Sequence, residues 1–311
     1  MARTTDSYFP LFRTIFAGVW SIVLLGFLWA SAPLFAANDS HGRDFRLAFP
    51  PNFHDSPTDN TDSLYIYIAS DTPTQGQITW KNSDGIEFTH VFVIDNPADV
   101  YTFSVSAEGV ELQGFNRNGF IPNFFEQNEE PVNQSFHITT DTDVTVYALN
   151  QASRSSDAFL VLPTDALGQY YSILSYNSDG NNTGGRLQGY STPSQFVVVA
   201  TQDGTDVTIT PSQPTWEGGR AIQHITLNAG ECYLVQAYLS DVVLTTDLTG
   251  TRIAASKPVS VIAGHQRATV PVEMSGMLRS RDCLLEQLPP IEAWGYSAIA
   301  VPYPIPYGVI N

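Results

Sequence analysis

The side chains with the clearest potential for polar chemistry are His265, Asp282, Glu286 and Gln287, which follow one another closely in the last third of the chain. Neither they nor the rest of the chain form a known catalytic pattern. There is no HExxH, no Gly-x-Ser-x-Gly, no phosphate-binding loop and no dinucleotide glycine fingerprint. We therefore expect these residues to bind a ligand or to stabilise the fold, and we expect no enzymatic activity.

His265 stands out because the chain repeats itself. The stretch 'DTDVTVYALNQ', which starts at Asp141, is similar to 'ASKPVSVIAGHQ', which starts at Ala255, and His265 takes the place of Asn150. Where both copies keep the same chemistry, packing explains the residue. Where one copy becomes more polar, the change needs a reason.

Glu286 and Gln287 are aligned in the same way with two apolar residues, Leu160 and Val161. Burying an unpaired carboxylate is costly, so Glu286 is expected to be exposed or paired. One hypothesis is a polar ligand site at one rim of the second copy. The other is an internal salt bridge or cap that holds a loop in place, and structural ion pairs are the more frequent case.

Four elements recur in the same order, with short runs of β-branched residues that alternate with polar ones, the pattern of half-buried strands. The matched segments are 64–80 with 195–210, 90–105 with 224–238, 137–151 with 252–266, and the run around Leu162-Pro163 with the run around Leu288-Pro289. Because each copy must hide its apolar side, we predict an all-β fold of two tandem antiparallel β-sandwich units related by internal duplication.

The predicted units span residues 44–176 and 190–300, with a Gly/Asn-rich linker at 177–189 and a tail, or the start of a truncated further module, at 301–311. Within the second unit, Asn228-Ala-Gly predicts a tight hairpin turn between two strands over 224–238. Helical periodicity is limited to one-turn segments at 162–168 and 283–295, where prolines prevent longer helices.

A run of about 17 extra residues lies in the first unit, within 113–131. It contains Phe120, Phe124 and Phe125, which are too apolar for an ordinary solvated loop. They are expected either to cover the sandwich as a lid or to form an exposed hydrophobic surface that binds a partner.

Charge restricts the possible partners. The chain carries 31 Asp and Glu against 14 Lys and Arg, a formal net charge of −17. Such a chain repels phosphate backbones, so nucleic acid is not expected as a ligand, and docking on anionic lipid is also disfavoured.

Clusters of acidic residues could bind Ca²⁺, but neither of the two clusters fits a calcium loop. The first contains Asp203 and Asp206 and the second contains Asp55, Asp59 and Asp62. Ordinary turn chemistry explains both better, so we expect no cofactor and no metal.

Residues 1–37 are predicted to be a signal peptide, with Arg3 and Arg13 before an uncharged apolar run and small residues after it. The alternative is an uncleaved signal anchor, which would be the route to membrane attachment. Either way, the body of the protein is expected to be secreted or exposed on the cell surface.

Cys232 and Cys283 are the two cysteines of the chain. In an exported protein they are consistent with one disulfide. Two separate buried thiols are the alternative.

Several long stretches resemble the N-terminal domain of the IgGFc-binding protein family. They are 'GRDFRLAFPPNF' (42–53), 'SSDAFLVLPTDALGQYYSILSY' (155–176), 'FVVVATQDGTDVTITP' (196–211), 'DLTGTRIAASKPVSVIAGHQ' (247–266) and 'DCLLEQLPPIEAWG' (282–295). The chain is similar to exported bacterial members of this family.

The resemblance implies an extracellular or cell-surface adhesion module without catalytic activity, which recognises proteins or glycoproteins and can form part of a longer chain. It does not imply an immunoglobulin ligand. The alternative function is a carbohydrate-binding or accessory module of an extracellular hydrolase. Trp80, Trp216 and Trp294 could stack on sugars but belong to separate elements.

Overall fold

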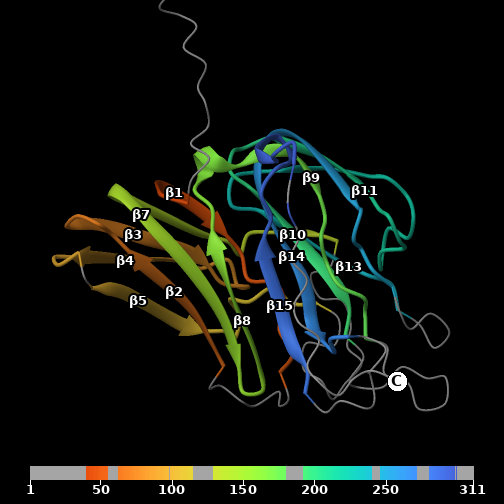
Figure 1. Ribbon diagram of the computed structural model, residues 1–311, viewed down its shortest axis with the longest axis horizontal. Coiled ribbons are helices and arrows are strands. Elements are labelled where there is room, and N and C mark those ends of the chain that lie inside the picture. Colours follow the sequence, from red (N-terminus) through yellow and green to blue (C-terminus); the bar gives the residue numbers. More distant parts are fainter. Residues whose placement is uncertain are drawn as a thin grey trace, which may run out of the picture. The chain divides into compact units, whose positions relative to one another are not determined.

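Two antiparallel sheets contain the strands of the computed structural model, which describes residues 40–54, 62–97, 99–114, 129–179, 192–239, 246–271, 280–297 and 299 (Figure 1). The predicted signal peptide, Phe120, Phe124, Phe125, most of the predicted linker and the predicted tail lie outside these residues. The described residues belong to one compact unit, Ala37–Asn311, and a second unit, Met1–Ala36, lies outside them. None of the described residues forms a helix long and apolar enough to cross a membrane.

The first sheet consists of seven strands in the order β4-β3-β7-β2-β5, with β1 and β8 also paired to β7. Its strands are β1 (Gly42–Leu47), β2 (Ser63–Ala69), β3 (Thr74–Lys81), β4 (Glu87–Ile94), β5 (Val100–Ser106), β7 (Phe136–Ala152) and β8 (Ser155–Val161).

The second sheet repeats this order as β12-β11-β14-β10-β13, with β15 and β9 also paired to β14 and the short β6 added beside β13. Its strands are β6 (Pro131–Val132), β9 (Gly168–Ser172), β10 (Ser194–Ala200), β11 (Thr205–Thr210), β12 (Gln223–Leu227), β13 (Cys232–Gln236), β14 (Arg252–Ala268) and β15 (Asp282–Gln287). The predicted all-β, antiparallel fold is confirmed.

The register repeats as well as the order. In the first sheet Ile78 of β3 stands opposite Ile138 of β7, and in the second sheet Ile209 of β11 stands opposite Ile253 of β14. Matched positions on the two central strands, each 17 residues long, are therefore 115 residues apart (253 − 138). This correspondence is what an internal duplication would produce, and duplication is our interpretation of it.

Each sheet curls so that its two outer strands approach each other. In the first sheet His90 Nε2 of β4 lies 2.5 Å from the hydroxyl of Tyr101 on β5. In the second sheet the Tyr233 hydroxyl of β13 donates to Gln223 Oε1 of β12 at 3.2 Å. The long central strand of each sheet thus separates two arms, which are β3–β4 and β2–β5 in the first sheet and β11–β12 and β10–β13 in the second. The two arms face each other, and each buries its apolar side against the other.

This curl corrects the predicted hairpin over 224–238. The β12 strand pairs with β11 and the β13 strand pairs with β10, so the two do not pair with each other. The turn at 228–230 instead carries the chain from one edge of the curled sheet to the other. A short turn is sufficient because the curl has brought the two edges close together.

Strand pairing also corrects, by one residue, the predicted alignment of the run around Leu162-Pro163 with the run around Leu288-Pro289. Asn150 pairs with Asp157, and the matching His265 pairs with Leu284, so the offset on this strand is 127 (284 − 157). The 3₁₀ turns agree: η1 (Thr164–Ala166) follows Pro163, and η3 (Ile291–Ala293) follows Pro290. The counterpart of Gln287 is therefore Leu160. The predicted one-turn helices are present as these two 3₁₀ turns.

Two hydrophobic cores result. The concave side of the second sheet forms one core, which includes Phe196, Val198, Ile209 and Val261. The other core combines the concave side of the first sheet with the convex side of the second sheet. The β8 and β15 strands lie side by side at this junction (Figure 1). Two short strands that lie within the predicted first unit, β6 and β9, pair with strands of the second sheet.

Candidate binding surface and the predicted site residues

The convex face of the second sheet is buried by the first half of the chain. On this face Val197 of β10 stands between Leu234 of β13 and Ile262 of β14. All three residues are buried in the core that they share with the first sheet. Every residue of β10 is buried, so this strand is covered on both sides.

The convex face of the first sheet is open. The residue that matches Val197 is Tyr67 of β2, which stands between Thr102 of β5 and Tyr147 of β7. Residues in β2 alternate strictly between buried and half-buried, as expected for a strand that is covered on one side only. Aliphatic side chains that are buried in the second half are thus replaced here by tyrosine and threonine.

Three tyrosines form the centre of this open face, which we call the tyrosine face and define by Tyr65, Tyr67 and Tyr147. The rings of Tyr65 and Tyr67 are stacked, with centroids 6.0 Å apart and an interplanar angle of 6°. Tyr147 is 48% exposed, and Val100 on β5, the strand beside β2, is 57% exposed. Tyrosine offers a large apolar ring and a polar hydroxyl, and it is enriched in binding surfaces.

The other arm of the first sheet carries a shallow hollow of about 370 Å³ on its outer side. Its lining includes Gln75, Gln77, Val91 and Asp141. Val91 and Val93 on the edge strand β4 are 67% and 54% exposed. The first sheet therefore presents apolar and amphipathic side chains to solvent on both arms.

His265, the first predicted site residue, is fully buried. Its Nδ1 accepts a hydrogen bond from the backbone N–H of Arg267 at 2.9 Å. Desolvation lowers the pKa of His265 to about 3, and Asp179 and the backbone of Asn177 oppose this shift only in part. The imidazole is therefore neutral at physiological pH and has a structural environment.

Close to His265, a buried ion pair joins Asp179 and Arg281, with Oδ2 and Nη1 3.4 Å apart. Thr269 donates to the same Oδ2 at 2.9 Å. These contacts join the segment before β10, the end of β14 and the start of β15. Arg281 is thus engaged by Asp179.

Asp282 and Gln287 connect the two sheets. Asp282 Oδ1 accepts from the backbone N–H of Ser156 on β8 at 2.7 Å. Gln287 is buried; its Oε1 accepts from the N–H of Leu162 at 2.9 Å, and its Nε2 donates to Ser260 Oγ at 2.9 Å.

Glu286 lies on β15 between these residues and is exposed. Partial desolvation raises the pKa of its carboxyl, and the nearby Asp157 adds to this effect. The structure therefore places Asp282 and Gln287 at one sheet junction, leaves Glu286 at the surface and buries His265. The contacts of Asp282 and Gln287 are those of a cap that holds a neighbouring segment in place. A ligand site formed by His265, Asp282, Glu286 and Gln287 stays a prediction.

A buried polar cluster in the first half was not predicted. His54 Nδ1 lies 2.5 Å from Asp62 Oδ2, and its Nε2 lies 2.6 Å from Glu111 Oε2. Glu111 Oε1 accepts from the Asn150 side chain at 2.8 Å and from the Asn52 backbone. The sequence had flagged Asp62 only as a candidate calcium ligand, because nothing local indicates that residue 111 packs beside residue 54.

The two cysteines are free and buried, so the alternative of two thiols describes the structure. Two strands, β10 and β14, separate β13 with Cys232 from β15 with Cys283. With strands about 4.8 Å apart, the two Cα atoms are at least about 14 Å apart, too far for a disulfide.

Two of the candidate calcium ligands, Asp203 and Asp206, contact protein groups, the first at a turn and the second across the β11–β12 strand pair. Asp203 Oδ1 accepts from the N–H of Ala229 at 2.9 Å, and Asp206 Oδ1 accepts from Thr226 Oγ1 at 2.7 Å. Asp55 and Asp59 lie outside the described residues.

Comparison with known proteins supports the resemblance found in the sequence. Residues 157–309 match the family described as IgGFc binding protein. The human IgGFc-binding protein (Homo sapiens) is 29% identical over 164 residues, which cover 51% of this chain and 3% of that protein. The resemblance to this family is confirmed over the matched segment, which contains β9 to β15.

Proposed function

We propose that this chain is an extracellular binding module that recognises a partner protein through the tyrosine face of its first sheet. The observation that carries the proposal is the difference between the two sheets. The second sheet has its convex face buried by the first half, whereas the matching face of the first sheet is open and has tyrosines in place of aliphatic residues.

Two further observations support a binding role. A family named for IgG Fc binding matches the second half of the chain, so a protein ligand is the natural first candidate. In the described residues, the polar clusters around His265 and His54 are buried, and their hydrogen bonds are directed to neighbouring strands and loops. Buried groups of this kind serve the fold, whereas the half-buried Tyr65 and Tyr67 and the exposed Tyr147 are available to a partner.

The test uses surface plasmon resonance with residues 38–311 immobilised and the Fc fragment of immunoglobulin G as the first protein probe. The triple variant Tyr65→Ser/Tyr67→Ser/Tyr147→Ser should weaken binding at least about tenfold, because tyrosines at the centre of an interface contribute most of its energy. The control is Tyr170→Ser, because Tyr170 is a comparably exposed tyrosine (52%) on β9 of the second sheet. Protein binding that is unchanged in the triple variant would contradict the proposal.

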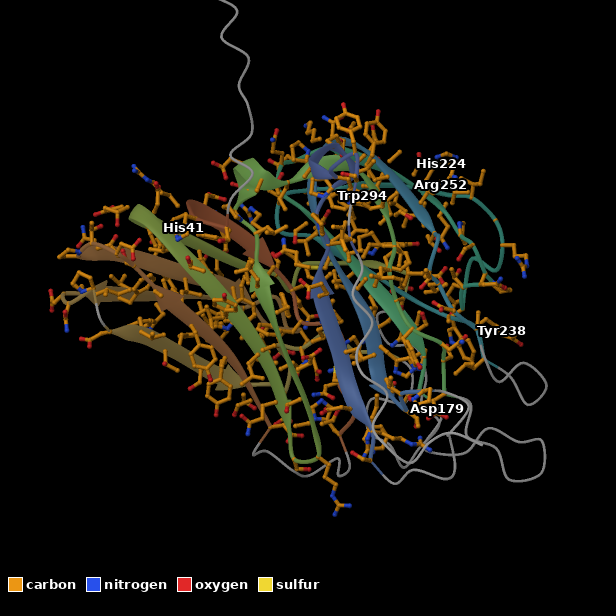
Figure 2. All side chains as sticks on the ribbon, viewed as in Figure 1. His41, Asp179, His224, Tyr238, Arg252 and Trp294 are labelled. Atoms are coloured by element: carbon orange, nitrogen blue, oxygen red, sulfur yellow. The ribbon has the colours of Figure 1, made fainter. Side chains whose placement is uncertain are left out.

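A glycan is the second candidate ligand, because stacked tyrosine rings on an open sheet can also support sugar rings. The tryptophans suit this role less well. Trp80 has Phe88 and Phe136 stacked against it at 5.3 and 5.9 Å, and Trp216 contacts Tyr238. Figure 2 shows Trp294 and Tyr238 well apart on the second half. A glycan panel screened with the same variants separates the two candidates: tyrosine-dependent binding to a glycan alone would favour the sugar.

A further inference from the structure

A polar cavity lies at the rim where the first sheet meets the turn between β12 and β13. Its volume is about 210 Å³, enough for a group the size of one amino-acid side chain or one sugar. Arg46 of β1, Trp80 and Lys81 of β3, and Asn133 line it from the first half, and Gly230 lines it from the second half.

The cations in this cavity are unusual for the chain. Only two lysines occur in the sequence, against 31 acidic residues, and one of the two is Lys81. Lys81 Nζ lies 3.5 Å from the carboxylate of Glu87, a largely exposed side chain that also lines the cavity. Arg46 has no hydrogen bond or ion pair with any residue that the structure describes.

Arg46 is also partly removed from water. Desolvation lowers the pKa of its guanidinium, although the charges of Asp44 and Asp203 oppose this effect. Asp44 is itself engaged by His137, with Oδ2 and Nε2 2.8 Å apart. The Arg46 side chain therefore keeps its five N–H donors available while much of its hydration has been lost, and such a group gains most from a bidentate anionic partner.

The cavity walls are held rigidly. Trp80 is fixed by Phe88, Phe103 and Phe136, whose ring centroids lie 5.1–5.9 Å from its own. Its buried indole Nε1–H has no acceptor among the described residues. On the other side, Gly230 has φ +84°, and a Cβ there would lie 3.6 Å from Arg46 Nη1, so the missing side chain leaves space beside the guanidinium.

We propose that this cavity binds a carboxylate, with Arg46 as the bidentate donor and Lys81 as the second cation at the rim. A carboxylate fits the planar fork of the guanidinium. Carboxylates occur both on acidic peptide side chains and on acidic sugars, and the site chemistry is the same for both. The cavity is separate from the tyrosine face, so the two proposals can fail independently.

The experiment follows the indole N–H resonance of Trp80 by NMR, assigned by its loss in Trp80→Phe. Residues 38–311 are titrated at constant ionic strength with two matched pairs: N-acetyl-aspartate amide against N-acetyl-asparagine amide, and glucuronate against glucose. We expect the acidic member of at least one pair to shift the resonance in a saturable way, while both neutral members leave it in place. The pair that responds identifies the source of the carboxylate.

Arg46→Gln should weaken this binding at least about tenfold, a loss of about 1.4 kcal/mol, and Lys81→Gln should weaken it less because that side chain lies at the rim. Lys257→Gln is the control for the loss of a lysine, because Lys257 is the other lysine of the sequence, donates to the Asp203 backbone and does not line the cavity. If Arg46→Gln does not fold, Lys81→Gln still tests the site. Equal shifts with the neutral compounds, saturable binding unchanged in Lys81→Gln and Arg46→Gln, or no shift with either acid would overturn the proposal.

Discussion

Asn150 and His265 occupy the same position in the two halves of the chain, and both side chains are fully buried. Asn150 of β7 pairs with Leu64, and His265 of β14 pairs with Ser194. Asn150 donates to Glu111 at 2.8 Å, whereas His265 accepts from the Arg267 backbone at 2.9 Å. The most conspicuous polar difference between the copies is thus a difference in buried hydrogen bonding, and His265 Nε2 has no hydrogen-bond partner among the described residues.

His265 should make the protein sensitive to acid. Its folded pKa is about 3, below the ordinary value of 6.5, so between these two pH values the unfolded chain binds more protons than the folded one. Stability should fall as pH drops below about 6.5, by about 1.4 kcal/mol per pH unit from this residue. The difference in unfolding free energy between pH 7 and pH 5, from urea titrations, should be about 2 kcal/mol smaller in His265→Asn.

The control for this experiment is His224→Asn, because His224 is exposed and lies far from Asp179 in Figure 2. It should keep the pH dependence of the parent protein. The same dependence in His265→Asn as in the parent would contradict the assignment of His265 as a buried neutral group.

Gln287 should stabilise the junction of the two sheets. In Gln287→Leu, which introduces the residue found at the matching position of the first half, the Leu162 N–H and the Ser260 hydroxyl both lose their partner. An unsatisfied buried group costs about 1–3 kcal/mol, and urea unfolding should show a loss of that size. Glu286→Gln, one residue earlier and exposed, should change stability by less than about 0.5 kcal/mol. Similar losses in the two variants would contradict the described roles.

Glu111 should be the most sensitive residue of the buried cluster in the first half. Glu111→Ala removes the carboxylate that binds His54 Nε2, the Asn52 backbone N–H and the Asn150 side chain. Breaking a buried charged network from one side costs about 3–5 kcal/mol, which should appear as a large decrease in the urea midpoint. Glu108→Ala, an exposed glutamate of the same loop, serves as the control. A loss below about 1 kcal/mol in Glu111→Ala would show that the cluster is not formed.

The two thiols should be protected in the folded protein. Burial raises the pKa of Cys232 to about 12 and raises that of Cys283 well above its ordinary value. Both should therefore react with a thiol reagent only after unfolding, and two thiols per chain should then titrate without prior reduction. If no thiol titrates in denaturant until a reductant is added, the cysteines are paired and the described separation of β13 and β15 is wrong.

The strands and their repetition could be predicted because they depend on local patterns. Alternation in 'LYIYI' and 'DVTIT' requires only that one side of each strand is buried. The shared register of the two central strands follows from the same similarity that is visible in the sequence.

What could not be predicted depends on distant contacts. In the sequence, Pro163 can be aligned with either Pro289 or Pro290. Only the hydrogen bonds of β8 and β15 show that Pro290 is its counterpart. The short turn at 228–230 can connect two edges of the sheet because the sheet curls. The residues of the turn do not themselves encode that curl. Which sheet keeps an open face is decided by the packing of the first half on the second, so sequence reasoning did not find Tyr65, Tyr67 and Tyr147. Their only signal was that tyrosine and threonine replace aliphatic residues at matched positions.

The central claim, that the tyrosine face is the binding surface, is tested most directly by hydroxyl-radical footprinting of residues 38–311 with and without the Fc fragment of immunoglobulin G. The account predicts that the partner protects Tyr65, Tyr67 and Tyr147 from oxidation, while Tyr170 and Trp294 of the second half are modified as in the free protein. Protection confined to β9–β15 and the 3₁₀ turn that follows them, with the three tyrosines modified as before, would contradict it.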